Sequence, residues 1–276
     1  MLPSPNPLVK IYHQSCYFNP NSNMPPSGLA IIIGAGPNTG TGIARILSHP
    51  KHGNLAVALL ARLQEGLNSV RSNLKETSPG SVVETFPTDT SPKNLKQAFH
   101  SIRSHSSFKD LKLKVAVYSV KHSSKKPFMD ETYEDFTESL EQYVGGAFTF
   151  SQEALKLFFE HHGEAPLSET GQKKGTLIFT GTLGALRCNA EYSAYGAGRS
   201  SVRQLAQALA REMSAKGVHV VHTIANGSIE DKNGEDQRIG KKMSADAVGK
   251  TYLWLSQQDP ELWTHELDLR PAAEKF

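Results

Sequence analysis

The chain has 276 residues, of which 38% are hydrophobic and 21% charged, so it can bury a sizeable core without cross-links. Its formal net charge of +3 is too small to predict a nucleic-acid or membrane partner. No segment approaches the roughly 20 apolar residues that cross a bilayer, and the histidines show no metal-ligand spacing, so we expect neither a membrane span nor a metal site. Cys16 and Cys188 lie far apart, which favours a reducing compartment and hence the cytoplasm.

Residues 1–27 differ in composition from the rest of the chain. They are rich in proline, asparagine and serine, and they lack the basic segment followed by an apolar segment that is typical of a secretory signal. This composition predicts a flexible or loosely docked N-terminal arm, followed by a single domain over residues 28–276.

The remaining sequence alternates between two kinds of pattern. Apolar runs predict strands at 29–33, 54–61, 81–86, 113–118, 176–180, 218–224 and 263–269. Helical spacing predicts helices at 43–47, 64–75, 94–105, 132–159, 193–215 and 244–257. Strands that alternate with helices in this way predict an α/β fold, a Rossmann-type doubly wound parallel sheet with helices on both faces. Such a fold binds ligands at the carboxyl ends of its strands, here those at 29–33 and 113–118.

A glycine-rich turn follows the first apolar run directly. Gly36, Gly40 and Gly42 have the spacing G-x-x-x-G-x-G, between the strand at 29–33 and the helix at 43–47. Glycine lets the backbone approach a diphosphate, and the helix N-terminus points amide donors at the charge. Glycines also build ordinary turns, but the flanking elements favour a dinucleotide site. We expect its residues to be Gly34, Gly36, Asn38, Thr39, Gly40, Gly42 and Ile43.

Over residues 28–270 the chain resembles the short-chain dehydrogenase/reductase family. The glycine-rich turn is similar to the cofactor turn of that family. Residues 195–212 resemble its catalytic helix, in which Tyr-x-x-x-Lys leads into an amphipathic run. The ending at 263–271, Trp-Thr-His-Glu-Leu-Asp-Leu-Arg-Pro, is similar to that of an atypical branch of the family.

The chain departs from the family pattern at several positions. The family's Asn-Asn-Ala-Gly falls on Tyr118-Ser119-Val120-Lys121, its helix-four Asn near Tyr143, its Ser on Thr182, its Lys on Arg199, and its Pro-Gly on Asn226-Gly227. Gly34 instead of Gly36 takes the role of the first glycine if the turn carries two extra residues.

The resemblance implies a catalytic role for three residues. Tyr195 would give a proton to a carbonyl oxygen, and the hydroxyl of Thr182 would hold that oxygen. Tyr195 and Arg199 are four residues apart on one helix face, so both can point at the cofactor. Arg199 would bring a permanent positive charge, but a guanidinium cannot relay protons as an ammonium can.

Each of these residues also has a structural interpretation. Tyr195 could simply pack against the sheet. Tyr192 competes with it at the same helix start, but the residue four positions after Tyr192 is Gly196, which is not basic. Arg199 could lie on the surface or clamp a phosphate, and Thr182 could cap a strand end. We expect Tyr143 to be a packing aromatic.

The second strand indicates which cofactor binds. Ala61 at its end is followed by Arg62, with no carboxylate to hold a ribose hydroxyl, and an arginine can bind the 2′-phosphate in a charge-assisted fork. The alternative is a solvated helix-start arginine. The lack of a carboxylate and the presence of Arg62 predict NADP(H). The resemblance places Asp89 beside the adenine, and the alternative is a plain turn residue. The resemblance further places Ser119, Tyr195, Arg199, Gly227 and Ile229 along the cofactor.

These observations predict an NADP(H)-dependent oxidoreductase for a small or medium-sized carbonyl or alcohol. The departures at the family's Asn, Ser and Lys positions leave two alternatives open. One is an enzyme with changed chemistry, such as imine reduction or a rearrangement in secondary metabolism. The other is a nucleotide-binding sensor without turnover. Segment 228–242 is rich in charge, which favours a mobile flap or a solvated loop. The resemblance implies a homodimer or homotetramer paired through the helices at 132–159 and 193–215.

Overall fold

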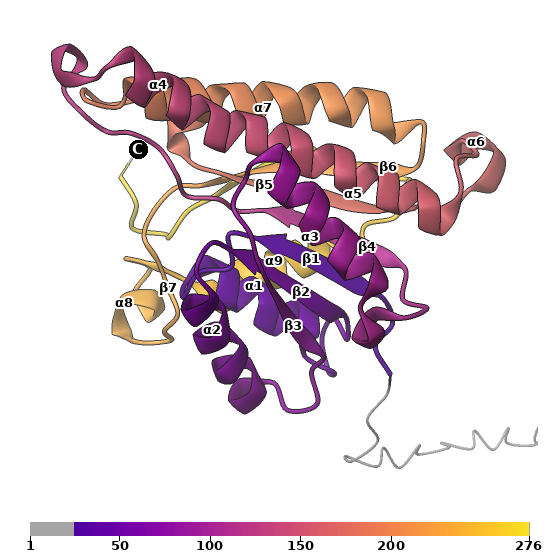
Figure 1. The fold of residues 1–276 in the computed structure, drawn as a ribbon. Helices are drawn as coiled ribbons and strands as arrows, with labels where there is room; N and C mark the ends of the chain where they lie inside the picture. The colour runs from indigo at the N-terminus through magenta and orange to yellow at the C-terminus, as the bar shows by residue number, and fades with distance from the viewer. Residues whose placement is uncertain (1–24, 276) are drawn as a thin grey trace, which may run out of the picture.

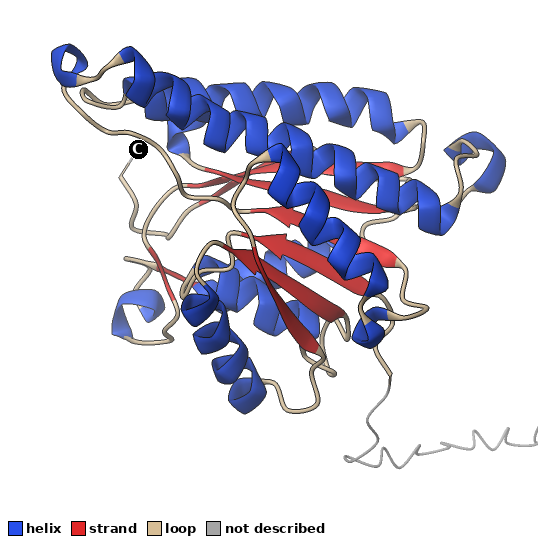
Figure 2. Cartoon of the chain, viewed as in Figure 1, coloured by secondary structure: helices blue, strands red, loops and turns tan. Residues whose placement is uncertain are grey.

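A seven-stranded parallel sheet in the order β3-β2-β1-β4-β5-β6-β9 forms the centre of the computed structural model, which describes residues 25–275 (Figures 1 and 2). Its strands are β1 Leu29–Ile33, β2 Ala56–Ala61, β3 Val83–Pro87, β4 Leu113–Tyr118, β5 Gly175–Gly181, β6 Val218–Ala225 and β9 Glu266–Leu269. The predicted doubly wound fold is confirmed. The arm predicted at 1–27 lies almost entirely outside the described residues.

Helices cover both faces of the sheet, as Figure 1 shows. They are α1 Thr39–Ser48, α2 Gln64–Thr77, α3 Pro92–Ser104, α4 Tyr133–Leu140, α5 Gly146–His162, α6 Leu167–Thr170, α7 Ser193–Ser214, α8 Glu235–Arg238 and α9 Ala245–Gln257. Side chains of α3, α5 and α7 share one buried cluster, and those of α1, α2 and α9 share the other. Within the described residues no helix is both long enough and apolar enough to cross a membrane.

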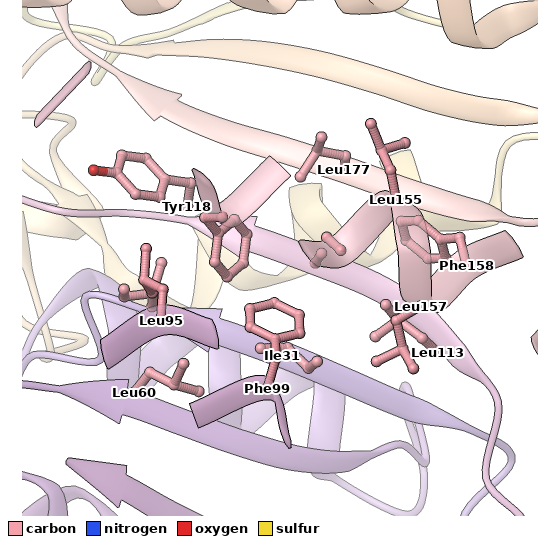
Figure 3. Close-up of a cluster of buried hydrophobic side chains, with 14 of the residues drawn as sticks. Ile31, Leu60, Leu95, Phe99, Leu113, Tyr118, Leu155, Leu157, Phe158 and Leu177 are labelled. Atoms are coloured by element: carbon pink, nitrogen blue, oxygen red, sulfur yellow. The ribbon is translucent and has the colours of Figure 1, made fainter. Parts of the chain in front are cut away.

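Successive side chains of β1 point alternately into these two clusters. Ile31 and Ile33 belong to the first cluster, whereas Ala30 and Ile32 belong to the second, and all four are buried. Figure 3 shows the first cluster, where aromatic and aliphatic side chains of α3 and α5 pack on the sheet. Both faces of a buried parallel strand are covered, so its sequence is apolar throughout.

The strand order places a switch point beside β1. β1 pairs with β2 on one side and with β4 on the other. The connections that leave β1 and β4 therefore diverge, which opens a crevice at their carboxyl ends. This is the place at which the sequence predicted a ligand.

The long helix predicted at 132–159 contains an irregular turn. α4 and α5 are joined by a π-helical turn, Glu141–Gly145, and the Tyr118 hydroxyl donates to the Tyr143 carbonyl at 2.8 Å. Just after this turn Gly146 is closely packed, since a Cβ there would lie 2.6 Å from the Thr90 side chain. Gly145 has more space, since the nearest atom to an added Cβ, in Glu141, is 4.0 Å away.

The charged segment 228–242 forms short elements that the sequence did not predict. β7, Ile229–Glu230, pairs with β8, Met243–Ser244, and α8 lies between them. Elements of two to four residues are too short to show a periodic pattern.

Candidate active site

Two adjoining pockets open at the carboxyl ends of β1 and β4, with volumes of about 560 and 580 Å³. Both are lined by Gly34, Gly36, Ser119, Val120 and Lys121. The first continues toward the ends of β2 and β3, and the second toward β5, α7 and the start of segment 228–242. The two form one elongated site that runs across the switch point.

The glycine-rich turn lines both pockets where they adjoin. Gly34 has a φ of +85°, and a Cβ there would overlap the carbonyl group of Ser119. A Cβ on Gly40 would lie 2.7 Å from Ala35 Cα, so the turn itself requires glycine there. Above Gly36 the space is open, with only the Gly34 carbonyl oxygen near, at 3.9 Å. The bare backbone of Gly36 therefore faces the pocket, as a diphosphate cradle requires.

The sequence grouped Gly42 and Ile43 with the cofactor contacts, but neither residue lines the pockets. A Cβ on Gly42 would overlap the carbonyl group of Ala245 in α9, and Ile43 is fully buried among core side chains. In this arrangement both residues position α1, whose first turn faces the site.

The pocket beside β2 and β3 contains Arg62 and Asp89. Arg62 is exposed. Asp89 accepts hydrogen bonds from the Ser91 hydroxyl at 2.6 Å and from Asn94 Nδ2 at 2.9 Å. The bond from Ser91 is the main cause that lowers the pKa of Asp89. Asp89 thus shapes the start of α3 and also borders the pocket.

The other pocket holds the predicted catalytic residues. Thr182 follows β5, Tyr195 lies in the first turn of α7, and their hydroxyl oxygens are 2.7 Å apart. Both residues line the pocket together with Asn38, Thr39, Ser119, Arg199, Gly227 and Ile229. Tyr192 lines a separate surface hollow around Cys188. The geometry therefore favours Tyr195 over Tyr192 as the reactive tyrosine.

Arg199 is buried beside Tyr195, with 2% of its surface exposed. Its guanidinium carbon lies 3.6 Å from the ring centroid of Tyr143 and 4.4 Å from that of Tyr195. Its Nη1 donates to Ser123 Oγ at 3.0 Å. Burial raises the pKa of Tyr143 to about 12, so its phenol is neutral and serves as a stacking surface. The expectation that Tyr143 is a packing aromatic is confirmed.

Lys125 is a pocket residue that the sequence did not indicate. It lines the pocket, and its Nζ lies 4.4 Å from the ring centroid of Tyr192 and 4.5 Å from that of Tyr195. A signal that could have found it was present but unused. Several basic residues follow β4, a strand that ends at the site, in the run Lys121-His122-Ser123-Ser124-Lys125-Lys126.

Ion pairs tie segment 228–242 to the site. Arg45 in α1 donates to both carboxylate oxygens of Asp231, at 2.8 and 2.7 Å, and to Asp246 at 2.5 Å. Asn38 Oδ1 accepts from the Asp231 backbone N–H at 3.4 Å. The segment is therefore fixed to α1 and to the glycine-rich turn at one point, beside Ile229.

The geometry described so far is that of a dinucleotide-binding oxidoreductase fold, with a hydroxyl pair at one end of its crevice. Residues 28–240 match the family model described as short chain dehydrogenase, and the chain therefore belongs to that family. No curated protein matches the sequence significantly.

Solved structures share the fold at low sequence identity. A short-chain dehydrogenase from Rhodopseudomonas palustris is 23% identical with a TM-score of 0.71, over 90% of this chain and 100% of that one. An alcohol dehydrogenase from the archaeon Thermococcus sibiricus, complexed with 5-hydroxy-NADP, is 19% identical with a TM-score of 0.70. The match covers 90% of this chain and 98% of that one. A single-residue variant of the actinorhodin polyketide ketoreductase with NADPH is 18% identical with a TM-score of 0.72. This match also covers 90% of this chain and 98% of that one.

Proposed function

We propose that this protein is an NADP(H)-dependent oxidoreductase that reduces the carbonyl, or oxidises the alcohol, of a small or medium-sized molecule. The observation that carries the proposal is the 2.7 Å pair of hydroxyls, Thr182 and Tyr195, in the same elongated site as the glycine-rich turn. Two similar structures bound to NADPH or to an NADP derivative are consistent with this choice of cofactor.

The residues of the site fit a dinucleotide. The open backbone at Gly36 and the start of α1 would hold the diphosphate, and Arg62 would pair with a 2′-phosphate. Thr182, Tyr195 and Arg199 surround the opposite end, where the nicotinamide would lie. A bound nicotinamide supplies or accepts the hydride.

The chain's own groups then handle the proton. The Thr182 hydroxyl can hold the substrate oxygen while the Tyr195 hydroxyl donates a proton to it as negative charge develops. Arg199 places a fixed positive charge 4.4 Å from the Tyr195 ring, which stabilises the phenolate left behind. Because a guanidinium keeps its proton, the phenolate regains one from water in the open pocket.

The test is oxidation of NADPH, followed by absorbance, on a panel of ketones and aldehydes. We expect turnover of at least one substrate class and a loss of about 100-fold or more in Tyr195→Phe, because the acid is removed. NADPH binding, measured by fluorescence, should change little. Tyr192→Phe is the matched control and should keep its activity. Equal activity of both variants would contradict the assigned role of Tyr195.

The buried Arg199 favours imine reduction as a second candidate activity. A protonated imine needs less acid assistance than a ketone, so a site without a proton-relaying lysine would suit it. Cyclic imines therefore belong in the same panel. Tight NADPH binding without turnover of any carbonyl or imine would instead favour the nucleotide sensor.

A further inference from the structure

The substrate end of the site carries uncompensated positive charge. Lys121, Lys125 and Arg199 line this pocket, and no Asp or Glu among the residues described does so. Lys121 also lines the pocket on the adenosine side, next to Gly36, where the cofactor's diphosphate would offset its charge. Lys125 lines only the pocket that holds Tyr195, and its Nζ is 4.5 Å from the ring centroid of that tyrosine, so its charge lies at the reacting end of the site.

Lys125 is held close to the reactive hydroxyl. Its Nζ is 4.5 Å from the Tyr195 ring centroid and 4.4 Å from that of Tyr192, a cation–π arrangement that orients the ammonium. Within residues 25–275 no carboxylate forms an ion pair with it. An ammonium at the edge of a pocket, without an anionic neighbour, is suited to bind an anion.

The loop that carries Lys125 is anchored at the preceding residue. The backbone N–H of Ser124 donates to Ser139 Oγ at 2.9 Å. Lys126 Nζ pairs with Asp135 at 2.6 Å. The Ser124 bond fixes the backbone next to Lys125, whereas the Lys126 pair is an exposed side-chain contact that turns this neighbouring lysine away from the pocket lining. A ligand would therefore lose less conformational entropy when it engages Lys125.

Arg199 supplies a second, independent observation at the same pocket. Its Nε is buried and has no hydrogen-bond partner among the described residues. A donor without an acceptor leaves the positive charge of this side chain less compensated, which adds to the attraction of the pocket it lines for an anion.

We propose that the substrate carries a carboxylate, which Lys125 binds beside the reacting carbonyl, so that the enzyme acts on oxo acids. This inference rests on the proposed function, which places the reacting carbonyl at Tyr195. In this arrangement Lys125 determines specificity and touches the substrate, while proton donation remains with Tyr195.

The experiment compares oxo acids with their methyl esters. The probes are 2-, 4- and 5-oxohexanoate and the three esters, because the distance between carbonyl and carboxylate is not fixed by the pocket. Calorimetry in saturating NADP+ measures binding without turnover, and NADPH oxidation measures kcat/KM. The proteins are wild type, Lys125→Met and, as the matched control, Lys126→Met, whose lysine is paired with Asp135 and lies outside the pocket.

We expect at least one acid to bind wild type about tenfold or more tightly than its ester, which is about 1.4 kcal/mol. Lys125→Met should reduce this preference to less than about threefold, and Lys126→Met should keep it. Equal binding of acids and esters, no binding of any acid, or a preference that survives in Lys125→Met would overturn the inference. Turnover of esters but not of acids would overturn it while leaving the proposed oxidoreductase function in place.

Discussion

The positive charge of Arg199 in α7 occupies a site that suits a guanidinium. Arg199 stacks its plane on the Tyr143 ring at 3.6 Å and donates to Ser123 Oγ at 3.0 Å. An ammonium has no plane to stack and is more strongly hydrated, so the two cations are not interchangeable in this buried position. The arginine is therefore part of the packing as well as part of the proposed active site.

Arg199→Lys should for this reason lower the stability of the protein, and it should not increase NADPH oxidation. We expect the free energy of unfolding to fall by about 2 kcal/mol, because a charge-assisted hydrogen bond and a stacking contact are lost. Chemical denaturation measures it, with Arg211→Lys on the exposed face of the same helix as control. A gain in both stability and NADPH oxidation in Arg199→Lys would contradict this account.

The candidate site could be predicted from the sequence only where a motif spacing exists. The pair Thr182 and Tyr195 came from the resemblance, and their 2.7 Å contact agrees with it. Lys125 and Ser123 lie in a loop without periodicity, and their distance from Tyr195 depends on how that loop folds back. Gly42 belongs to the same motif as Gly36, but only coordinates distinguish a helix-packing glycine from one that faces a ligand.

At the scale of elements, the site depends on the close crossing of α1 and α9. Gly42 of α1 faces Ala245 of α9, and a Cβ on Gly249 of α9 would lie 2.5 Å from the Gly42 carbonyl oxygen. The absence of side chains lets the two helices approach, and this contact sets the direction in which the first turn of α1 points. Arg45 reinforces the crossing through Asp246.

Gly42→Ala should force these helices apart. We expect a loss of about 2 to 3 kcal/mol in the free energy of unfolding, since overpacked backbone contacts cannot relax cheaply. Gly66→Ala is the matched control, because Gly66 lies in α2 with nothing within 4 Å of an added Cβ. That variant should gain about 0.5 to 1 kcal/mol from helix propensity. Equal effects in thermal or chemical denaturation would refute the packing role of Gly42.

Elements whose local sequence pattern is continuous were predicted best. β4 was predicted at 113–118, which are its bounds in the structure. The π turn within the helix at 132–159 could not be predicted, because it depends on the Tyr118 hydroxyl bonding to a backbone carbonyl of another element. Tertiary contacts of this kind leave no local pattern in the sequence.

At the scale of the whole molecule, buried histidines on β6 couple stability to pH. His219 is fully buried and stacks on Trp263, and its Nε2 lies 2.8 Å from the Thr264 carbonyl oxygen. Burial lowers its pKa to about 4. Burial also lowers the pKa of His222, on the same strand.

Stability should therefore rise with pH between about 4 and 6.5. In this window the unfolded chain binds more protons than the folded one, so the contribution of His219 is present above pH 6.5 and is lost as the pH falls toward 4. Its size is on the order of 3 kcal/mol. Urea denaturation at several pH values measures the slope, and His219→Gln should reduce it. An unchanged slope in that variant would assign the effect to other groups.

The central claim is that the crevice at the ends of β1 and β4 takes a nicotinamide coenzyme and that Arg62 selects its 2′-phosphate. Calorimetry of NADPH and NADH with wild type and Arg62→Ala tests it most directly. The account predicts that wild type binds NADPH at least about tenfold more tightly than NADH, and that Arg62→Ala loses most of this preference. Failure of the folded protein to bind either coenzyme, or tighter binding of NADH, would contradict it.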